Sequence, residues 1–340
     1  MAMIPPCTSK PASPAHPPRR ALLAGAGGLL ASARRSRAEA AADWPQGPVH
    51  FICPYPPGGA IDTLCRLYGA RMAELTGSPF VVENRVGAGG TVGTEAIARA
   101  RPDGQVLGQA GSGTLAIAPV LYGKLPYDAA QDLTLVCGMY RGAFVVVVAP
   151  TFPAQSAEAL LALLRANPGR YNYASPGVGT PQHLAAELLK SRAGSDMLHV
   201  PYRGGAAALL DLLAGRVDML FDIVNGPLQA IREGKVRALA VLGAERAAVL
   251  PEVPAMAELL PDVAVTSWSI IAGPARMPAP IVARISEATR EAMASPALVA
   301  RYRDLGIEPW WTPGDGLPAF RAAEETRLAP IIRASGARPG

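Results

Sequence analysis

The stretch VHFICPYPPGGAID, residues 49–62, joins a short apolar run to a loop of prolines and glycines and then to the start of a helix. Val49 to Cys53 predicts a strand, because apolar and β-branched residues dominate it. From Ile61 to Leu75 the apolar residues fall on one helical face, and Gly77 ends that period. A strand, a glycine loop and a helix in this order form the repeating unit of parallel α/β sheets.

The same unit recurs along the chain after this stretch. Two more copies complete the first set: Phe80–Val82, loop 87–90 and helix Val92–Ala100; then Val106–Leu107, loop 111–113 and helix Leu115–Leu121. A second set contains the helix Ser156–Arg165, the strand Tyr171–Ala174, the loop 175–179, a helix opened by Thr180-Pro181, the strand Met197–Pro201, the helix Gly205–Ala214, the strand Val217–Phe221, a helix after 225–227 and the strand Val236–Leu242. The chain is therefore predicted to be α/β, with two Rossmann-like lobes and a hinged cleft.

The valine-rich run Ala143–Ala149 is too continuous for a half-exposed strand, so it predicts a buried strand or a crossover between lobes. After an irregular proline-containing stretch, a strand at Trp268–Gly273 and three helices return the chain to the first lobe. The predicted bounds are 43–145 plus 246–340 for lobe 1 and 146–245 for lobe 2.

Residues 1–42 have the layout of an export signal: a basic segment ending in Arg19-Arg20, an apolar stretch from Ala21 to Ala33, and small residues before cleavage near Ala40 or Ala42. The paired arginines favour the twin-arginine route over the general one without deciding between them. Thirteen apolar residues fall short of the ~20 that span a bilayer, so cleavage is favoured over anchoring. The expected location is the periplasm.

The basic excess belongs to this segment. The chain carries 32 basic and 27 acidic side chains, and residues 1–42 hold six of the first and one of the second, which leaves 26 of each. A neutral mature protein lacks the electrostatic footprint of a nucleic-acid-binding protein. No nucleic-acid partner is expected.

Three cysteines remain after Cys7 leaves with the signal: Cys53, Cys65 and Cys137. They have no metal-type spacing and lie among apolar residues, which favours small buried side chains. The sequence does not decide whether Cys53 and Cys65 form a disulfide in an oxidising compartment. No metal and no cofactor are expected.

Enzyme signatures are scarce. The mature chain holds three histidines and no HExxH, GxSxG or P-loop pattern. Ser175, His183 and Asp222 could be arranged as nucleophile, base and orienting carboxylate of an α/β hydrolase, but Pro176 follows Ser175 where an elbow helix would begin. Binding is favoured over catalysis, and no catalytic residue is predicted.

The glycine loops suit anion binding. A helix N-terminus exposes unpaired N–H groups and carries about half a positive charge, so several of them at one sheet edge can hold an anion. Gly58 and Gly59 would let the backbone approach a ligand closely. The loop 87–90 resembles a dinucleotide loop, yet its third glycine is displaced and no acidic residue ends the next strand.

Several stretches together resemble the Bug-type substrate-binding proteins of tripartite tricarboxylate transporters, over nearly the whole mature chain. They are PPGGAID (56–62), VENRVGAGG (82–90), RPDG (101–104), LAIAP (115–119), YNYAS (171–175) with Thr180 and His183, VPYRG (200–204), LLAGRVD (212–218), Phe221-Asp222, VRALAV (236–241) and PEVP (251–254). The sequence departs from the usual pattern at Pro176 and Ile223, which leaves the identity of the ligand open.

The resemblance implies a periplasmic binding protein of type II fold that closes around a small carboxylate and delivers it to a membrane permease. Mapped onto this chain, it implies one wall formed by Tyr55, Gly58, Gly59 and Asp62 with Ser112 beside it, and a facing wall formed by Ser175, Thr180, His183 and Asp222. Asp62 is also a candidate helix-start residue, and His183 could orient a water or simply pack. A monomer is expected, and an exported ligand sensor is an alternative with the same clamp.

Overall fold

The computed structural model describes residues 44–335 and 337, and the predicted export signal lies outside them. The described strands form one mixed sheet in the order β2-β1-β3-β9-β4-β7-β5-β6, with β8 and β10 also paired to β4. The strands are β1 (Val49–Cys53), β2 (Phe80–Asn84), β3 (Val106–Gly111), β4 (Leu133–Val148), β5 (Asn172–Ser175), β6 (Leu198–Pro201), β7 (Met219–Ile223), β8 (Arg237–Val241), β9 (Thr266–Pro274) and β10 (Ile307–Pro309).

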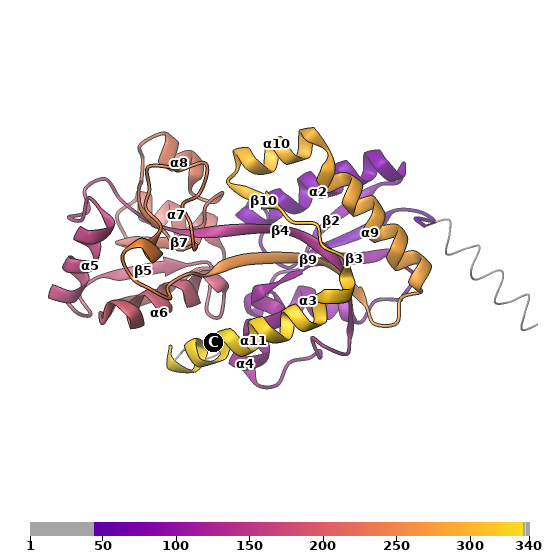
Figure 1. Ribbon diagram of the computed structural model, residues 1–340, viewed down its shortest axis with the longest axis horizontal. Helices are drawn as coiled ribbons and strands as arrows, with labels where there is room; N and C mark the ends of the chain where they lie inside the picture. Colours follow the sequence, from indigo (N-terminus) through magenta and orange to yellow (C-terminus); the bar gives the residue numbers. More distant parts are fainter. Residues whose placement is uncertain (1–43, 336, 338–340) are drawn as a thin grey trace, which may run out of the picture. The chain divides into compact units, whose positions relative to one another are not determined.

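Helices cover this sheet in two groups (Figure 1). The α-helices of the described chain are α2 (Ala60–Thr76), α3 (Thr91–Ala98), α4 (Ala118–Tyr122), α5 (Ala157–Ala166), α6 (Pro181–Ala193), α7 (Gly205–Leu213), α8 (Leu228–Arg232), α9 (Ala279–Ala294), α10 (Pro296–Asp304) and α11 (Leu317–Ala334). The predicted α/β rotation is confirmed for both sets of units, with strands β1, β2 and β3 parallel to one another and β5, β6 and β7 likewise.

The long strand β4 joins the two sets. Its residues 133–143 pair with β9 in antiparallel fashion, and its residues 144–148 pair with β7 and β8. In Figure 1, β4 and β9 run side by side between the two groups of helices. The run Ala143–Ala149 was predicted as a buried strand or a crossover, and it is the buried end of a strand that belongs to both parts of the sheet.

Helix α2 shows how local sequence produces the first unit. Its buried residues Leu64, Cys65, Tyr68 and Met72 recur at helical spacing and face the sheet. Gly77 then adopts the left-handed conformation (φ 68°), and its N–H donates to the Ala73 carbonyl, which ends the helix. The predicted bounds of this helix differ from the observed ones by one residue at each end.

Two buried apolar clusters lie on the two parts of the sheet. One gathers side chains of β3, β9 and α11 around Trp268, and the other gathers side chains of β7, α7 and the end of β4 around Leu220. In the described part of the chain, no helix combines the length and the apolar character needed to cross a bilayer. The carboxyl ends of β1, β5 and β6 all lead into segments that line one cavity.

Candidate functional site

A cavity of about 230 Å³ opens between the loop after β1, the segments that follow β5 and β6, and Asp222 of β7. Its lining residues are Tyr55, Pro56, Pro57, Gly59, Ala60, Ile61, Pro176, Gln182, Arg203, Gly204, Gly205, Ala206, Ala207 and Asp222. In open α/β sheets, ligands bind outside the carboxyl ends of the strands, which is where this cavity lies. Prolines and alanines make much of its wall apolar.

One side of the cavity is the N-terminus of α2. Gly59 precedes the helix and provides no side-chain cap, so the first N–H groups near Ala60 and Ile61 keep no capping partner. Gly58 has φ 74°, a conformation that favours glycine, and its N–H donates to Asp62 Oδ2 (2.9 Å). The glycine pair thus turns the chain and leaves the helix start open.

The other side is the N-terminus of α7. Gly204 (φ 126°) precedes this helix, again without a side-chain cap, and Gly205, Ala206 and Ala207 line the cavity. Gly204 also packs against the loop after β1, because a Cβ at this position would lie 3.0 Å from Pro56 Cγ. Two uncapped helix N-termini therefore border one cavity, and both favour negative charge.

Arg203 adds a full positive charge at the edge of this cavity. Its side chain is exposed and has neither an ion pair nor a hydrogen bond with any described residue. An arginine without a protein partner keeps its bidentate donors free for a carboxylate. Arg203 is not among the predicted site residues, so its place at the cavity is a finding of the structure.

Asp222 is the only carboxylate among the lining residues and is buried. Its Oδ1 accepts hydrogen bonds from Gln182 Nε2 (3.0 Å) and from the Ile223 N–H (2.8 Å). Burial nevertheless raises the pKa of this carboxyl to about 6. Space for the carboxylate comes from Gly205 and Gly226, where an added Cβ would lie 2.1 Å and 2.6 Å from Oδ2.

Asp62, a predicted site residue, supports the loop and does not line the cavity. Its carboxylate accepts from the Gly58 N–H, from Arg66 Nε (2.9 Å) and from Asn84 Nδ2 (2.7 Å). These donors lower the pKa of Asp62 against the opposing effect of burial, the largest single influence on it. The alternative role at the helix start fits this geometry.

Ser175, Thr180 and His183 belong to a separate hydrogen-bond network, which lies around residues 175–183 and not at the cavity. Ser175 Oγ lies 2.7 Å from His199 Nε2, and Thr180 caps α6 by accepting from the His183 N–H (3.4 Å). His183 Nδ1 accepts from the Gly179 N–H (3.2 Å), and its ring stacks on His199 with centroids 4.0 Å apart. None of these three predicted residues lines the cavity.

The arrangement of a hydrolase is not assembled. The hydrogen-bond partner of Ser175 is His199 rather than His183, and Asp222 pairs with Gln182. Burial lowers the pKa of His183 to about 3 and that of His199 to about 4, so both rings are neutral near pH 7. Among the described residues, no carboxylate hydrogen-bonds either histidine side chain to orient it as a base.

Of the nine predicted site residues, the structure places Tyr55, Gly59 and Asp222 at the cavity. Gly58 and Asp62 shape its loop, and Ser112 is buried at the start of a π-helical turn (Ser112–Ile117) away from the lining. Sequence reasoning missed Gln182 and the start of α7. A signal for the second was present, because the glycines of VPYRGG directly precede a predicted helix.

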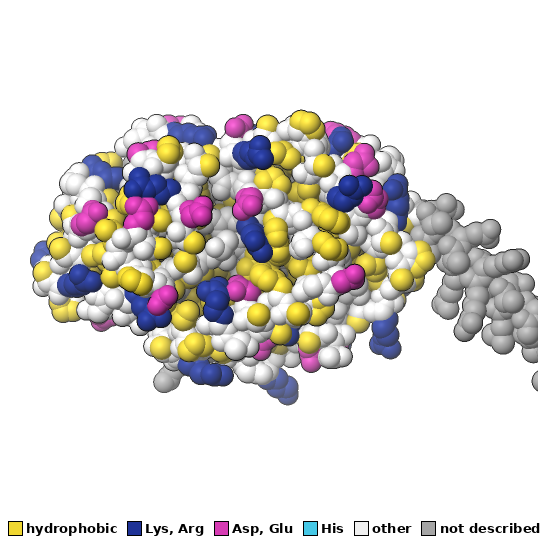
Figure 2. Space-filling view, in the orientation of Figure 1, with side chains coloured by type: hydrophobic (Ala, Val, Ile, Leu, Met, Phe, Trp, Pro, Cys, Tyr) yellow, Lys and Arg dark blue, Asp and Glu magenta, His cyan; other side chains and the backbone are white. Residues whose placement is uncertain are grey.

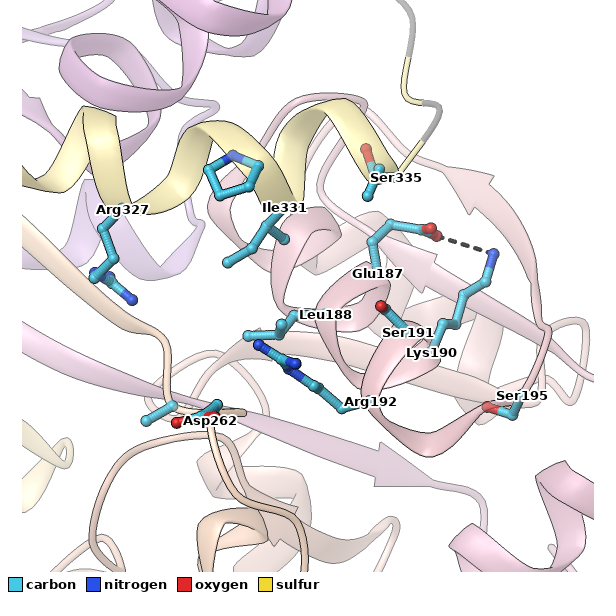
Figure 3. A pocket seen from close by; sticks show the side chains of 13 residues that line it. Glu187, Leu188, Lys190, Ser191, Arg192, Ser195, Asp262, Arg327, Ile331 and Ser335 are labelled. Carbon is cyan, nitrogen blue, oxygen red and sulfur yellow. Dashed lines mark ion pairs between the residues drawn. The ribbon is translucent and has the colours of Figure 1, made fainter.

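A larger hollow of about 780 Å³ lies elsewhere, between α6, α11 and residues 262–264 (Figure 3). The side chains around it carry both signs of charge, including the Glu187–Lys190 ion pair (3.2 Å). It borders the C-terminal ends of α6 and α11, where helix dipoles favour cations over carboxylates. It is therefore the poorer candidate for an anion.

Acidic and basic side chains are interspersed on the face drawn in Figure 2, without an extended patch of one sign. Among residues 44–335 and 337, no group of three or more His, Cys, Asp or Glu side chains is arranged to hold a metal ion.

Comparison with known proteins identifies the family. The model of the tripartite tricarboxylate transporter family receptor matches residues 64–337. The chain belongs to this family. Binding proteins of the family are periplasmic, and the solved ones have a two-lobed α/β fold, which confirms the predicted fold class.

Three relatives illustrate the similarity. BugT of Bordetella pertussis is 35% identical over 93% of this chain and 98% of its own. The R. palustris protein Rpa4515, solved with adipate, is 29% identical with a TM-score of 0.84, covering 87% of this chain and all of that one. MatC of Rhodopseudomonas palustris, solved with malate, is 30% identical with a TM-score of 0.78, covering 85% and 100%.

Proposed function

We propose that this family member captures a small carboxylate between its two lobes and delivers it to the membrane permease of a tripartite transporter. The observation that carries the proposal is the pair of uncapped helix N-termini at α2 and α7, with the unpaired Arg203 at the same cavity. Together they supply N–H groups, two positive dipole ends and one full positive charge. The carboxylates bound by two relatives, adipate and malate, support the same ligand class.

The lobes are proposed to be residues 43–145 with 246–340, and residues 146–245. Strand β4 pairs with β9 as far as Ala143 and with β7 starting at Phe144. This change of partner supports a lobe boundary at that point. Across the cavity, Asn225 Nδ2 donates to the Ala60 carbonyl (2.9 Å), which joins the two proposed lobes. Release of that bond would accompany opening.

We further propose that the chain acts as a periplasmic monomer after cleavage near Ala40 or Ala42, and that it binds without turnover. Ester substrates incubated with the parent protein and with Ser175→Ala test the last point, since turnover that disappears in the variant would contradict binding alone.

A thermal-shift screen against dicarboxylates, hydroxy acids and amino acids tests the proposal itself. A ligand present at 100 times its Kd stabilises the native state by about 2.7 kcal/mol, so a bound carboxylate raises the Tm. A library without any effect on the Tm, for protein shown to be free of carried-over ligand, would refute it.

Arg203→Gln is expected to weaken carboxylate binding about tenfold, because the variant loses one charge-assisted hydrogen-bonding group at the cavity. Isothermal titration calorimetry measures the change in Kd. The matched control is Arg192→Gln, which removes another exposed arginine without described partners, located at the larger hollow. If Arg192→Gln weakens binding and Arg203→Gln does not, the ligand occupies the larger hollow and the proposed site is wrong.

A further inference from the structure

Two buried cysteines lie at the two ends of the loop that forms one wall of the cavity. Cys53 is the last residue of β1 and Cys65 lies in the second turn of α2, and both are fully buried free thiols in the structure. The eleven residues between them include Tyr55, Gly59 and Ile61 of the cavity lining. Any bond between the two sulfurs would therefore close this wall into a small ring.

The packing of α2 on β1 sets the two thiols against each other. Alternate residues of a strand share a face, as Phe51 and Cys53 do, and residues three apart on a helix share a face, as Cys65 and Tyr68 do. Phe51 and Tyr68 are in contact, with ring centroids 5.2 Å apart. From this contact, Cys53 is the next residue on the same face of β1, and Cys65 is the preceding residue on the same face of α2.

The titration behaviour of the thiols agrees with this geometry. Contact with the Cys65 thiol is the largest influence on Cys53 and lowers its pKa, whereas burial raises the pKa of Cys65. Cys53 Sγ also lies 3.7 Å from the Tyr55 carbonyl at the start of the loop. The third thiol, Cys137 on β4, instead contacts Ser286 and Thr289 of α9.

We propose that Cys53 and Cys65 form a disulfide in the exported protein, and that this bond holds the loop 54–64 in its ligand-ready conformation. The proposal rests on the proposed export and carboxylate site. Cys137 remains a free thiol.

The oxidant is a disulfide, either of a thiol oxidoreductase or of a small molecule such as oxidised glutathione. A thiolate of one cysteine attacks a sulfur of that disulfide and expels the first thiolate; the second cysteine then attacks the mixed disulfide and expels the other. Two electrons pass to the oxidant, and the two protons of the cysteines end on its two sulfurs. Because both thiols are fully buried in the fold, the reaction takes place while the chain folds in the periplasm, and the chain would then be exported unfolded by the general route rather than folded by the twin-arginine route.

Two consequences follow from such a ring. Cross-linking residues twelve apart restricts the unfolded chain and raises stability. It also leaves less loop freedom to lose when a ligand binds, which strengthens binding without a new contact. Protein refolded with both thiols reduced would lack both effects.

Mass spectrometry gives a direct test. The full chain, expressed with its own N-terminus and recovered from the periplasm without reductant, is unfolded, alkylated and digested. Both cysteines lie on one tryptic fragment, because the sequence has no Lys or Arg between Arg37 and Arg66. The expected fragment is lighter by two hydrogen atoms and unalkylated, whereas Cys137 is alkylated. Cleavage before Asp62 should yield two pieces that separate only after reduction.

A second arm does not depend on export or on any ligand. Reduced, unfolded protein is refolded in a mixture of reduced and oxidised glutathione and should form the same bond. If all three thiols are alkylated in both arms, the proposal is overturned. If the bond forms but no carboxylate binds, the proposed function fails and the disulfide stands.

Variants test the effect on the loop. Parent refolded with reductant, so that both thiols stay reduced, should have a Tm lower by about 5 °C and a Kd for the best carboxylate from the screen roughly threefold higher than the disulfide-bonded parent. The double variant Cys53→Val/Cys65→Ala, which fills both buried positions with apolar groups, should behave alike after refolding with and without reductant. Cys137→Ala, the matched control, should show the same difference as the parent. Equal Tm and equal Kd for the disulfide-bonded and the reduced parent would contradict the role assigned to the bond.

Discussion

Gly205→Ala is expected to weaken carboxylate binding roughly 100-fold while leaving the protein folded. The new methyl group would lie 2.1 Å from Asp222 Oδ2, a distance that no real contact tolerates, so the carboxylate must move. Moving it disrupts the hydrogen bonds from Gln182 and from the Ile223 N–H, which hold Asp222 in place with or without a ligand. The displaced carboxylate then takes space in the cavity that Asp222 lines, and the expected factor of 100 in Kd corresponds to about 2.8 kcal/mol at about 1.4 kcal/mol per factor of ten.

Fold stability should fall as well, because the same two hydrogen bonds support Asp222 in the fold without a ligand. Alanine is a better helix former than glycine by about 0.8–1.0 kcal/mol within a helix, which offsets part of the strain at the start of α7. The matched control is Gly47→Ala, because a Cβ at Gly47 would meet nothing within 4 Å. Titration calorimetry of both variants, with circular dichroism to confirm folding, checks the expectation.

A double-mutant cycle separates this mechanism from simple blocking of the cavity. If the methyl group acts by displacing Asp222, then Gly205→Ala should cost much less affinity in an Asp222→Ala background. An equal cost in both backgrounds would show that the methyl group acts on the ligand directly.

The first strand–loop–helix unit could be predicted from the sequence, because its local residue patterns agree with the tertiary structure. The strand 49–53, the glycine loop and the helical period up to Gly77 each depend on neighbouring residues only. The long strand β4 was predicted only in its second half, because Gly138 and Gly142 interrupt the pattern of its first half. Both glycines serve packing: a Cβ would lie 2.4 Å from the Trp310 carbonyl at Gly138, and 2.8 Å from Ile307 at Gly142.

Site residues could be predicted from the sequence only where one continuous segment forms that part of the site. The loop after β1 can be predicted from its own prolines and glycines. The hydrogen-bond partner of Ser175 cannot be predicted in this way, because it depends on which strands lie side by side. Parallel pairing of β5 with β6 places Tyr173 opposite His199, and this pairing brings His199 to Ser175. Similarly, the role of Gly205 at the start of α7 follows from Asp222, seventeen positions later, on β7.

Acidification from pH 7 to pH 5 is expected to destabilise the fold by about 2 kcal/mol, and the stacked pair His183 and His199 is the main cause. In the unfolded chain both rings take up protons near pH 6.5, whereas burial lowers their pKa values in the fold to about 3 and about 4. Between these limits the unfolded state binds more protons, so the free energy of unfolding falls as the pH falls. Each ring contributes about 1–2 kcal/mol over this range, with His199 at the lower end because it is partly exposed.

Other titratable groups, which lie near the histidine pair or change protonation between pH 7 and pH 5, also affect how the free energy of unfolding depends on pH. Lys190 lowers both histidine pKa values, and Glu187 and Asp196 line a hollow of about 440 Å³ together with His183 and His199. Asp222 acts in the opposite direction: burial raises its pKa to about 6, so the fold binds the extra proton between pH 6 and about 4 and gains roughly 1 kcal/mol. Carboxyls with lowered pKa values, such as Asp62 and Glu258, lose their contribution mainly below pH 4.5, outside the range tested.

His199→Gln separates the histidine pair from the rest. Glutamine does not titrate and can still hydrogen-bond Ser175, so the variant should lose about half of the pH dependence while remaining folded at pH 7. The exposed His50, which pairs with Glu83 on the surface, provides the control His50→Gln, expected to leave most of the slope intact. Urea unfolding at pH 7, 6 and 5 measures the slope directly. A slope unchanged in His199→Gln would show that the stacked rings are already protonated in the fold, which the Gly179 N–H donated to His183 Nδ1 argues against.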